Sequence, residues 1–418
     1  MSTFSQLAET LIGSEIVRLG NLINERIAKG EDIYNYTIGD FDPGIFGIPE
    51  GLEDDIHAAY EHHRTNYPPA DGIAPLRQAV AAFVKHRQGL DYATNEIQIA
   101  SGGRPLIYSL FRMLVDPGDK VIYAVPSWNN NHYVHMNGGQ HCVIEARPEA
   151  SFMPTAADIR PHLGDARLLC LCTPQNPTGT TFSKDALQDI CDLVLEENSR
   201  RGAEDKKLYV MFDQMYGLLT YGDVVHYNPV TLRPAMKEYT VFIDGISKSF
   251  AATGVRVGWA MGPAPLIAKM KALLTHIGAW APMAEQVATA SFLANEPAID
   301  HYLQGFRAEL EYRLVSIYEG IARLKAKGFP VDAISPQAAL YLTVKFDLAG
   351  RQAADRKLET QEDVTDYLLA EAKLAVVPFY AFGASRQSPW YRLSIGTCDK
   401  HTIPQMLAQL EAALARLR

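Results

Sequence analysis

The chain has 418 residues, a length that suggests two or three packing units. Hydrophobic residues make up 47% and charged residues 21%, with 30 glycines and 24 prolines, which excludes collagen-like, coiled-coil and disordered classes. The formal net charge is −9 and no run is rich in Lys or Arg, so the composition supports neither a nucleic-acid partner nor an anionic membrane surface.

The N-terminus and the cysteines indicate where the protein is found. Residues 1–6 lack a basic segment followed by an apolar one, and no apolar stretch approaches the roughly 18 residues that a membrane span needs. The five cysteines are few and odd in number, which argues against a disulfide framework and for a reducing compartment. We therefore expect a soluble cytoplasmic protein.

Hydrophobic spacing predicts alternating helices and strands from about residue 75. Four apolar residues between 76 and 84 repeat at helical spacing, with Pro75 suited to a first turn and Gly89 to a C-terminal stop. Short apolar runs predict strands, and apolar residues at helical spacing predict the helices between them. The strands are expected at 97–100, 121–125, 168–172, 208–212 and 239–243, and further helices follow Leu106 and Ser183.

This alternation predicts an α/β fold with a mainly parallel central sheet covered by helices on both faces. A long helix is expected at 296–327, after which strands at 339–346 and 375–379 and helices at 362–373 and 401–417 indicate a smaller α+β domain. We predict an N-terminal arm together with part of the small domain (1–48), a large domain (49–300) and a small C-terminal domain (301–418).

Polar clusters follow five of the predicted strands, where ligands bind in open parallel sheets. They are residues 101–104, 126–129, 173–179, 213–216 and 244–250, the last followed by the Gly254 to Gly258 segment. In this order and spacing the chain resembles the fold-type-I pyridoxal-phosphate enzymes, specifically the class I and II aminotransferases of the aspartate aminotransferase type. The resemblance extends from residue 35 to residue 394, and it implies the cofactor pyridoxal 5'-phosphate and a homodimer with shared active sites.

Lys248 is the lysine that the resemblance assigns to the Schiff base with the cofactor aldehyde. A lysine with an ordinary pKa of about 10.4 is mostly unreactive near neutrality unless burial or nearby cations lower that pKa. The alternative for Lys248 is a solvated surface lysine. Its position after a buried strand and eight residues before Arg256 favours the catalytic role.

Asp213, Tyr216 and Asn176 resemble the residues that bind the cofactor ring. Asp213 ends an apolar strand, and a carboxylate there can pair with the pyridine nitrogen and keep it protonated, although Asp after a strand can also cap a helix. Tyr216 and Asn176 resemble the two donors to the ring's phenolic oxygen. Trp128 is at the position of the aromatic residue that stacks on the ring, with a core tryptophan as the alternative.

The phosphate of the cofactor needs backbone N–H groups at a helix start and a fixed cation. Gly102 and Gly103 precede a predicted helix, and Arg256 has the guanidinium that suits a phosphate dianion. By resemblance, Tyr67 reaches the phosphate of the neighbouring subunit. The family often has a serine three residues before the Schiff-base lysine, whereas this chain has Gly245, so Ser247 is left as the candidate side-chain contact.

Arg392 resembles the arginine that binds the substrate's α-carboxylate by a bidentate pair, with Gly39 offering a backbone N–H to the same group. Asn176 is also assigned to the substrate. Arg104 stands where related bacterial enzymes have a lysine for a distal carboxylate, which favours aspartate, glutamate or a similar dicarboxylate. Arg104 could equally contact phosphate, cap the dimer interface or point to solvent.

The function that these residues indicate is an aminotransferase that exchanges an amino group between an L-amino acid and a 2-oxo acid by a ping-pong mechanism. A lyase on the same fold, acting by β-elimination, C–S lysis or decarboxylation, would use the same residues. A non-catalytic aminotransferase-like binding protein is a further alternative, and a Rossmann enzyme lacks its glycine fingerprint here. No metal site is expected, because Cys170 and Cys172 lack a second pair.

Overall fold

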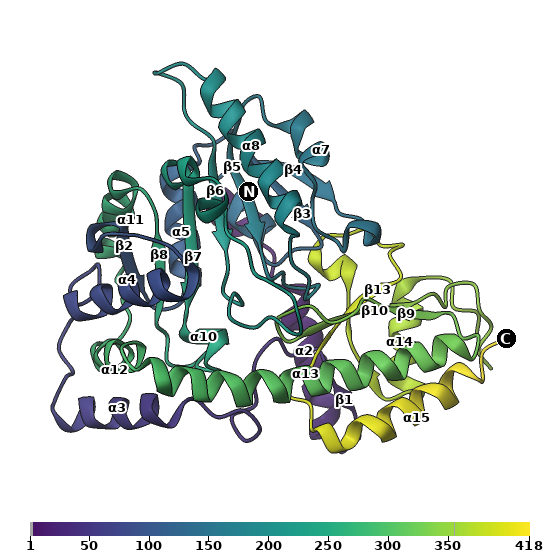
Figure 1. The fold of residues 1–418 in the computed structure, drawn as a ribbon. Coiled ribbons are helices and arrows are strands. Elements are labelled where there is room, and N and C mark those ends of the chain that lie inside the picture. The colour runs from purple at the N-terminus through teal and green to yellow at the C-terminus, as the bar shows by residue number, and fades with distance from the viewer. Residues whose placement is uncertain (1–2, 355) are drawn as a thin grey trace.

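The structure is a computed structural model that describes residues 3–354 and 356–418. Figure 1 shows a larger part built around one sheet and a smaller part that holds the C-terminal elements, with the long helix α13 (Glu296–Ala326) running along both. No helix in the described part of the chain is both long and apolar enough to cross a membrane.

The larger part contains a seven-stranded sheet in the order β2-β8-β7-β6-β5-β3-β4. Strand β8 runs antiparallel to both of its neighbours and the remaining pairs are parallel, so the mainly parallel sheet predicted from the sequence is confirmed. In sheet order the strands are β2 (Ile97–Ala100), β8 (Gly258–Met261), β7 (Thr240–Gly245), β6 (Tyr209–Asp213), β5 (Ala166–Cys172), β3 (Lys120–Val125) and β4 (Gln140–Glu145).

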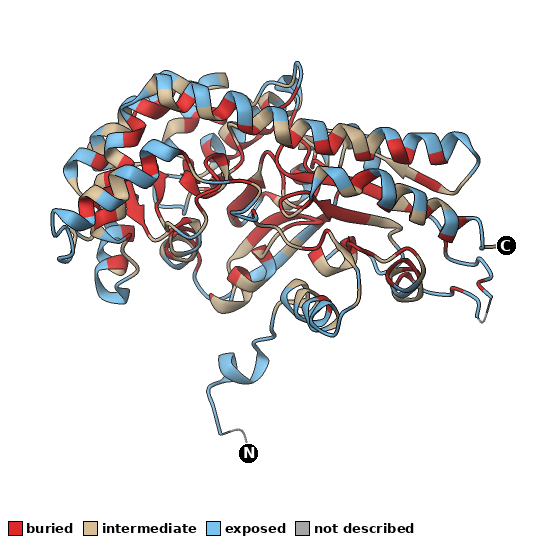
Figure 2. Ribbon diagram, turned by 90° about the horizontal axis from the view of Figure 1, so that it is seen from below, coloured by how far each residue is buried: buried red, intermediate tan, exposed pale blue. Residues whose placement is uncertain are grey.

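Helices cover both faces of this sheet because successive strand residues point to opposite sides. In β3, Ile122 belongs to the core on one face, whereas Val121 and Tyr123 belong to the core on the other. The first face packs against α4 (Ala74–Gln88), α8 (Lys184–Arg200) and α12 (Met283–Leu293), and the second against α5 (Gly103–Leu114), α6 (Asn130–Met136) and α11 (Ala264–Ile277). Figure 2 shows the buried residues concentrated on the strands and on the sides of the helices that face the interior.

The smaller part has a four-stranded antiparallel sheet in the order β12-β13-β10-β9. Its strands are β12 (Val377–Pro378), β13 (Trp390–Ser394), β10 (Tyr341–Phe346) and β9 (Val331–Ala333), and its core includes residues of α13, α14 (Gln361–Glu371) and α15 (Ile403–Leu414). The single strand predicted at 375–379 is two short ones, because β11 (Leu374–Ala375) pairs with the N-terminal β1 (Tyr34–Asn35) and only β12 joins the four-stranded sheet.

N-terminal residues lie against this smaller part. In α2 (Glu15–Ala28), Ile23 is buried in a cluster with Leu369 and Ala375, whereas α3 (Glu50–Glu61) packs on α12 of the larger part. The boundary predicted between residues 300 and 301 falls inside α13, and the division at 48, 300 and 418 remains a prediction.

Strands β5, β6 and β7 end side by side at one edge of the large sheet. Cys172 at the end of β5 is in register with Asp213 of β6, and Asp213 with Ile243 of β7. The turn after β7 leads directly into the short helix α10 (Ile246–Ser249), which carries Lys248. The parallel register therefore brings residues that are far apart in the sequence to one place.

Candidate active site

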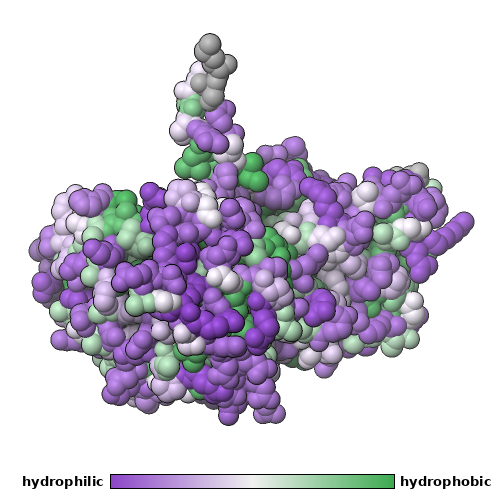
Figure 3. All heavy atoms as spheres, turned by 90° about the horizontal axis from the view of Figure 1, so that it is seen from above, coloured by the Kyte–Doolittle hydropathy of each residue, from purple (hydrophilic) through white to green (hydrophobic). Residues whose placement is uncertain are grey.

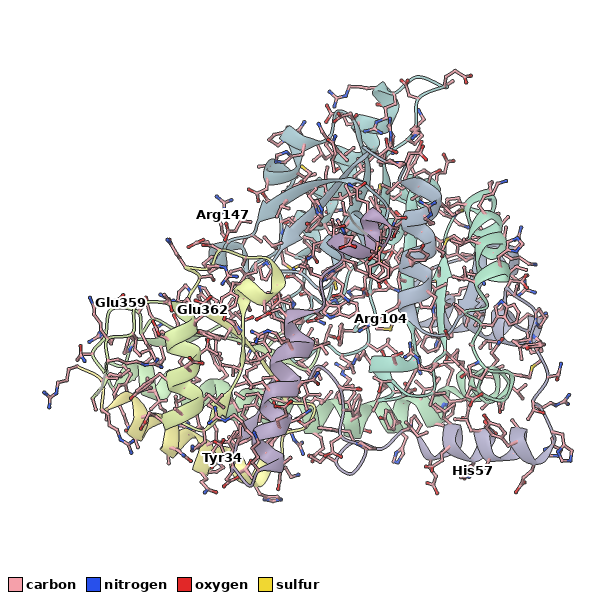
Figure 4. The ribbon with its side chains drawn as sticks, turned by 180° about the vertical axis from the view of Figure 1, so that it is seen from behind. Tyr34, His57, Arg104, Arg147, Glu359 and Glu362 are labelled. Carbon is pink, nitrogen blue, oxygen red and sulfur yellow. The ribbon has the colours of Figure 1, made fainter. Side chains whose placement is uncertain are left out.

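A cavity of about 660 Å³ opens at this edge of the sheet, between the larger and smaller parts. Figure 4 places Arg104 there, near the middle of the molecule, with Tyr34 in the smaller part and His57 at the far end of the larger part. The cavity is lined by most of the residues predicted from the sequence: Gly39, Gly103, Arg104, Trp128, Asn176, Asp213, Tyr216, Ser247, Lys248, Arg256 and Arg392.

Lys248 is held in the cavity by the loop that follows β1. Its Nζ donates a hydrogen bond to the carbonyl oxygen of Gly39 at 2.7 Å and lies 3.7 Å from Oδ1 of Asp40. Burial lowers the pKa of Lys248 to about 8, with Asp40 opposing the shift and the positive charges of Arg392 and Arg104 adding to it. An amine with this pKa is partly neutral near pH 7, so it can act as a nucleophile or base.

Asp213 ends β6 and faces the cavity with its carboxylate. Its Oδ1 accepts the backbone N–H of Met215 at 3.1 Å, which stabilises the turn after the strand. Burial raises the pKa of Asp213 to about 6, and the Met215 bond opposes this shift only in part. A cationic group beside the carboxylate would compensate for the buried charge, so this position favours a protonated ring nitrogen.

Tyr216 contacts the smaller part across the cavity. Its hydroxyl lies 2.7 Å from that of Tyr341 on β10, and the two rings meet edge to face at 5.5 Å. Burial raises the pKa of Tyr216 well above its ordinary value, so its hydroxyl stays protonated and able to donate.

Arg392, on β13 of the smaller part, is almost fully buried beside the cavity. Its Nη1 donates to Oδ1 of Asn176 at 3.1 Å and its Nη2 to the carbonyl oxygen of Thr37 at 2.6 Å. The guanidinium carbon lies 4.9 Å from the ring centroids of Tyr341 and Phe382, so the cation is held between two aromatic faces. Nε of Arg392 is buried and has no hydrogen-bond partner among the described residues. A buried cation with spare donors is suited to an anionic ligand.

Two glycines let the arginine side chains of the cavity pack closely against the backbone. A Cβ at Gly39 would come within 3.3 Å of Nη1 of Arg392, and a Cβ at Gly102 would collide with the guanidinium of Arg256. Gly102, with φ of 83°, is the residue before α5, so the free N–H groups of the helix start lie beside the Arg256 guanidinium. Arg256 itself donates to the carbonyl oxygens of Thr253 and Ser101 at 2.6 and 2.9 Å. This corner can hold a phosphate-like anion.

Gly245 has no room for a side chain. A Cβ there would meet Cα of Gly258 and the carbonyl oxygen of Val257 at 2.9 Å, because β7 and β8 are in register at this point. A serine at this position therefore requires the backbone to move. Ser247, which lines the cavity and is buried, is the nearest serine on the same turn.

Arg104 stacks on Trp128, with its guanidinium carbon 4.6 Å from the ring centroid. Arg104 is in the first turn of α5 and is exposed, whereas Trp128 is half-buried. Arg104 therefore lies at the cavity wall, beside the indole, and its role stays a prediction.

Comparison with known proteins decides the family. The family model for aminotransferase class I and II matches residues 35–410. The chain belongs to this family.

Known members of the class I and II aminotransferases match the chain almost end to end. An aspartate aminotransferase of Bacillus sp. (strain YM-2) is 29% identical over 90% of this chain and 91% of that protein. A probable aspartate/prephenate aminotransferase of Rhizobium leguminosarum bv. phaseoli is also 29% identical, over 97% and 95%. The crystal structure of the Rhizobium meliloti aspartate aminotransferase has a TM-score of 0.91 at 25% identity and covers 100% of both chains. The Thermus thermophilus aspartate aminotransferase with maleate has a TM-score of 0.87 at 26% identity, over 99% and 100%.

The sequence reasoning missed three groups in the cavity of this aminotransferase: Asp40, Tyr341 and an N-terminal segment. Asp40 contacts Lys248, and its place directly after Gly39 was the available signal. An N-terminal segment also lines the cavity, with Ser14, Ile16 and Val17. Residues 3–13 project from the body (Figure 3), and Thr10 Oγ1 lies 2.9 Å from Nε2 of His135. The helical spacing of Ile16, Leu19 and Ile23 could have predicted α2, but nothing in it points to a cavity.

Two predicted site residues do not line the cavity of the described chain: Gly102, which directly precedes α5, and Tyr67. The side chain of Tyr67 is 85% exposed and meets the ring of Trp280 edge to face, at a centroid distance of 5.5 Å. Asn129, with a φ of 60°, directly precedes α6, which begins at Asn130. In residues 3–354 and 356–418 no group of His, Cys, Asp or Glu side chains is placed to hold a metal ion.

Proposed function

We propose that this protein is a pyridoxal 5'-phosphate-dependent aminotransferase that uses a dicarboxylic amino acid such as aspartate or glutamate as donor and a 2-oxo acid as acceptor. The observation that carries the proposal is Lys248, a buried amine with a pKa lowered to about 8, in a cavity that also holds a buried carboxylate, Asp213. The family membership and the named aspartate aminotransferases among its relatives support the same reaction.

The residues present fit this cofactor. The lowered pKa of Lys248 suits an amine that must attack an aldehyde, and the raised pKa of Asp213 suits a carboxylate awaiting a ring cation. The α5 N-terminus at Gly102, with the Arg256 guanidinium packed against it, suits a phosphate dianion. The residues that would hold the cofactor are Lys248, Asp213, Tyr216, Asn176, Trp128, Gly102, Gly103, Ser247, Arg256 and Arg104, with Tyr67 supplied by the neighbouring subunit.

When bound, the cofactor would take up the electrons released at the substrate's Cα and keep the amino group between the two half-reactions. Arg392, with Asn176 and Gly39 beside it, binds the α-carboxylate and so orients the Cα–H bond. Lys248 Nζ then removes the proton from Cα as a general base. Burial between the two parts of the molecule keeps water away from this step. A first oxo acid leaves before the second enters, which gives ping-pong kinetics.

Arg104 supports a dicarboxylate because it adds a cation to the cavity wall and forms no ion pair with a carboxylate of the described residues. The substrate's distal carboxylate would meet the guanidinium where it stacks on Trp128. Replacing Arg104 by methionine keeps an unbranched apolar stem and removes the charge, so kcat/KM for aspartate should fall by about 10²-fold while that for a neutral donor should change little.

We also propose a homodimer in the cytoplasm. The exposed Tyr67 supports a site completed by a second copy, and the five free cysteines support a reducing compartment. Gel filtration with light scattering tests the dimer.

The decisive experiment is borohydride reduction of the purified protein followed by peptide mass mapping. The cofactor mass should be attached to Lys248, and attachment elsewhere or nowhere would refute the proposal. A panel of amino acids, followed by the absorbance change from the aldehyde to the amine form of the cofactor, then ranks the donors. Conversion by aromatic or aliphatic donors alone would refute the dicarboxylate preference, and release of ammonia without an oxo acid acceptor would indicate a lyase instead.

A further inference from the structure

A buried carboxylate that the proposed reaction does not use lies directly behind the active site. Asp244 is the next-to-last residue of β7, four positions before Lys248, and its side chain is 4% exposed. Its hydrogen-bond partners among the described residues are all neutral: the side chains of Gln88 and Gln214 and the backbone N–H of Gly245.

The contacts of Asp244 satisfy both of its carboxylate oxygens. Oδ1 accepts the N–H of Gly245 at 2.7 Å, and Oδ2 accepts Nε2 of Gln88 at 3.0 Å and Nε2 of Gln214 at 3.1 Å. All three partners are donors, so a carboxylate, which only accepts, is the side chain that suits this position. Burial raises the pKa of Asp244 to about 7, and the three donors oppose that shift and favour the charged form.

Gln214 links this carboxylate to the strand that carries Asp213. Gln214 is fully buried and directly follows Asp213, and its backbone N–H donates to the carbonyl oxygen of Ile243 on β7 at 3.0 Å. Its side-chain Nε2 also donates to Oε1 of Gln88 at 2.6 Å. The ends of β6 and β7 are therefore joined by a main-chain bond and by a side-chain bond.

His226 completes the network on the far side. Its Nε2 lies 3.3 Å from Oε1 of Gln214, an atom that can only accept, so Nε2 carries the hydrogen. Burial lowers the pKa of His226 to about 4, so this histidine is neutral and adds no charge. The hydrogen bonds therefore form a chain in which His226 donates to Gln214 and Gln214 donates to Asp244.

We infer that Asp244 and Gln214 form an acid–amide pair that positions the cofactor-binding groups, by holding the end of β6, with Asp213, at a fixed distance from the β7 turn that leads to Lys248. Asp213 and Lys248 have to act at opposite ends of one cofactor ring, so a change of about 1 Å in the distance between them would lower the reaction rate. The inference rests on the proposed function for the roles of those two residues. Asp244 itself touches neither the cavity nor a reacting atom, so it is a positioning residue.

Single replacements should break the pair. In Asp244→Asn, the amide NH2 group replaces one of the two acceptor oxygens. It then faces another donor, either the N–H of Gly245 or the amide groups of Gln88 and Gln214, and this donor–donor contact is buried. In Gln214→Glu, two carboxylates would face each other without a cation. We expect each variant to lower kcat per cofactor-loaded enzyme by about tenfold or more and to weaken retention of pyridoxal phosphate by a similar factor, with KM for the amino donor almost unchanged.

The double variant Gln214→Glu, Asp244→Asn exchanges the two partners and keeps one acid and one amide. The new carboxylate at position 214 then accepts hydrogen bonds from the new amide at position 244 and from His226. It also accepts one from Gln88, once the side-chain amide of Gln88 has flipped by about 180°. The oxygen of the new amide accepts from Gly245, so every donor again has an acceptor. We expect the double variant to recover kcat and cofactor retention to within about threefold of the wild type.

Asp347→Asn, a change in an exposed ion pair with Lys345, is the control and should have no effect on either quantity. The experiment measures kcat per bound cofactor, the dissociation constant of pyridoxal phosphate and the thermal midpoint for the wild type and the four variants. If the singles lose thermal stability but keep kcat per bound cofactor, or if the double variant is no better than the singles, the inference is wrong.

Borohydride labelling of Lys248 in the wild type separates this inference from the proposed function. Labelled wild type with unaffected variants overturns only the inference, whereas unlabelled wild type overturns the proposed function itself.

Discussion

The larger and smaller parts of the molecule contribute to the cavity in different ways. The larger part supplies Asp213 and Lys248 from neighbouring strand ends, whose relative positions are fixed by the sheet register. The smaller part supplies Arg392 from the middle of a strand, and this arginine holds Asn176 of the larger part and Thr37 of the N-terminal loop. Groups that need fixed mutual geometry thus share one sheet, whereas the group for the incoming carboxylate lies where the two parts meet.

This difference predicts that replacing Asp213 or Lys248 in the larger part impairs the chemical step and that replacing Arg392 in the smaller part impairs substrate binding. The ratio of the effect on kcat to the effect on KM measures the distinction.

The largest effect is expected for Lys248→Ala. The variant lacks the amine that removes the Cα proton, so kcat should fall by at least the order of 10⁴-fold. Cofactor should still bind through Arg256 and Asp213, which absorbance and native mass spectrometry can detect. Lys325→Ala, on an exposed lysine paired with Asp332, is the matched control. Transamination retained in Lys248→Ala would show that another group removes the proton.

Asp213→Asn should come next, with kcat reduced on the order of 10³-fold and KM little changed. The amide keeps the shape of the side chain and the bond from Met215 but cannot stabilise a protonated ring nitrogen. Steady-state kinetics and the absorbance spectrum of the bound cofactor test this together. If Asp213 only capped the turn after β6, Asp213→Asn would keep nearly full kcat, since an Asn oxygen caps a turn equally well.

Arg392→Lys should have a smaller effect, and of a different kind. A lysine keeps the positive charge but loses the paired N–H donors, the contact with Asn176 and the stacking between Tyr341 and Phe382. We expect kcat/KM for the amino donor to fall by about 10²-fold, mostly through KM. Arg323→Lys, on an exposed arginine of α13, is the control. A fall confined to kcat would contradict the division of roles between the two parts.

Much of the larger part could be predicted from the sequence, because its strands and its polar strand ends are local patterns. The runs before Asp213 and Lys248 predict buried parallel strands, and a parallel sheet necessarily brings their ends together. Gly102 and Gly103 before a helix are an equally local signal, which the φ of 83° at Gly102 explains.

The groups that the sequence reasoning missed depend on long-range packing. Tyr341 contacts Tyr216 across 125 residues of sequence, and the segment with Ser14 and Val17 lines a cavity formed mainly by residues beyond position 100. The periodicity of hydrophobic residues predicts helices and strands, but it does not predict contacts between distant segments. The stacking of Arg104 on Trp128 likewise depends on how α5 sits against the turn after β3.

The smallest expected effect concerns Asp40, which lies on the loop that joins the two parts. Its carboxylate, 3.7 Å from Lys248 Nζ, stabilises the ammonium form and so opposes the lowering of the Lys248 pKa by burial. In Asp40→Asn the pKa of Lys248 should therefore fall further below about 8, and more of the amine is neutral at pH 7. The acidic limb of the pH–rate profile should move to lower pH by about half a unit to one unit, since Asp40 is half exposed and screened by solvent. Asp40→Glu keeps the charge and should keep the acidic limb near its original position. If the limb does not move in Asp40→Asn, the charge of Asp40 does not affect the pKa of Lys248.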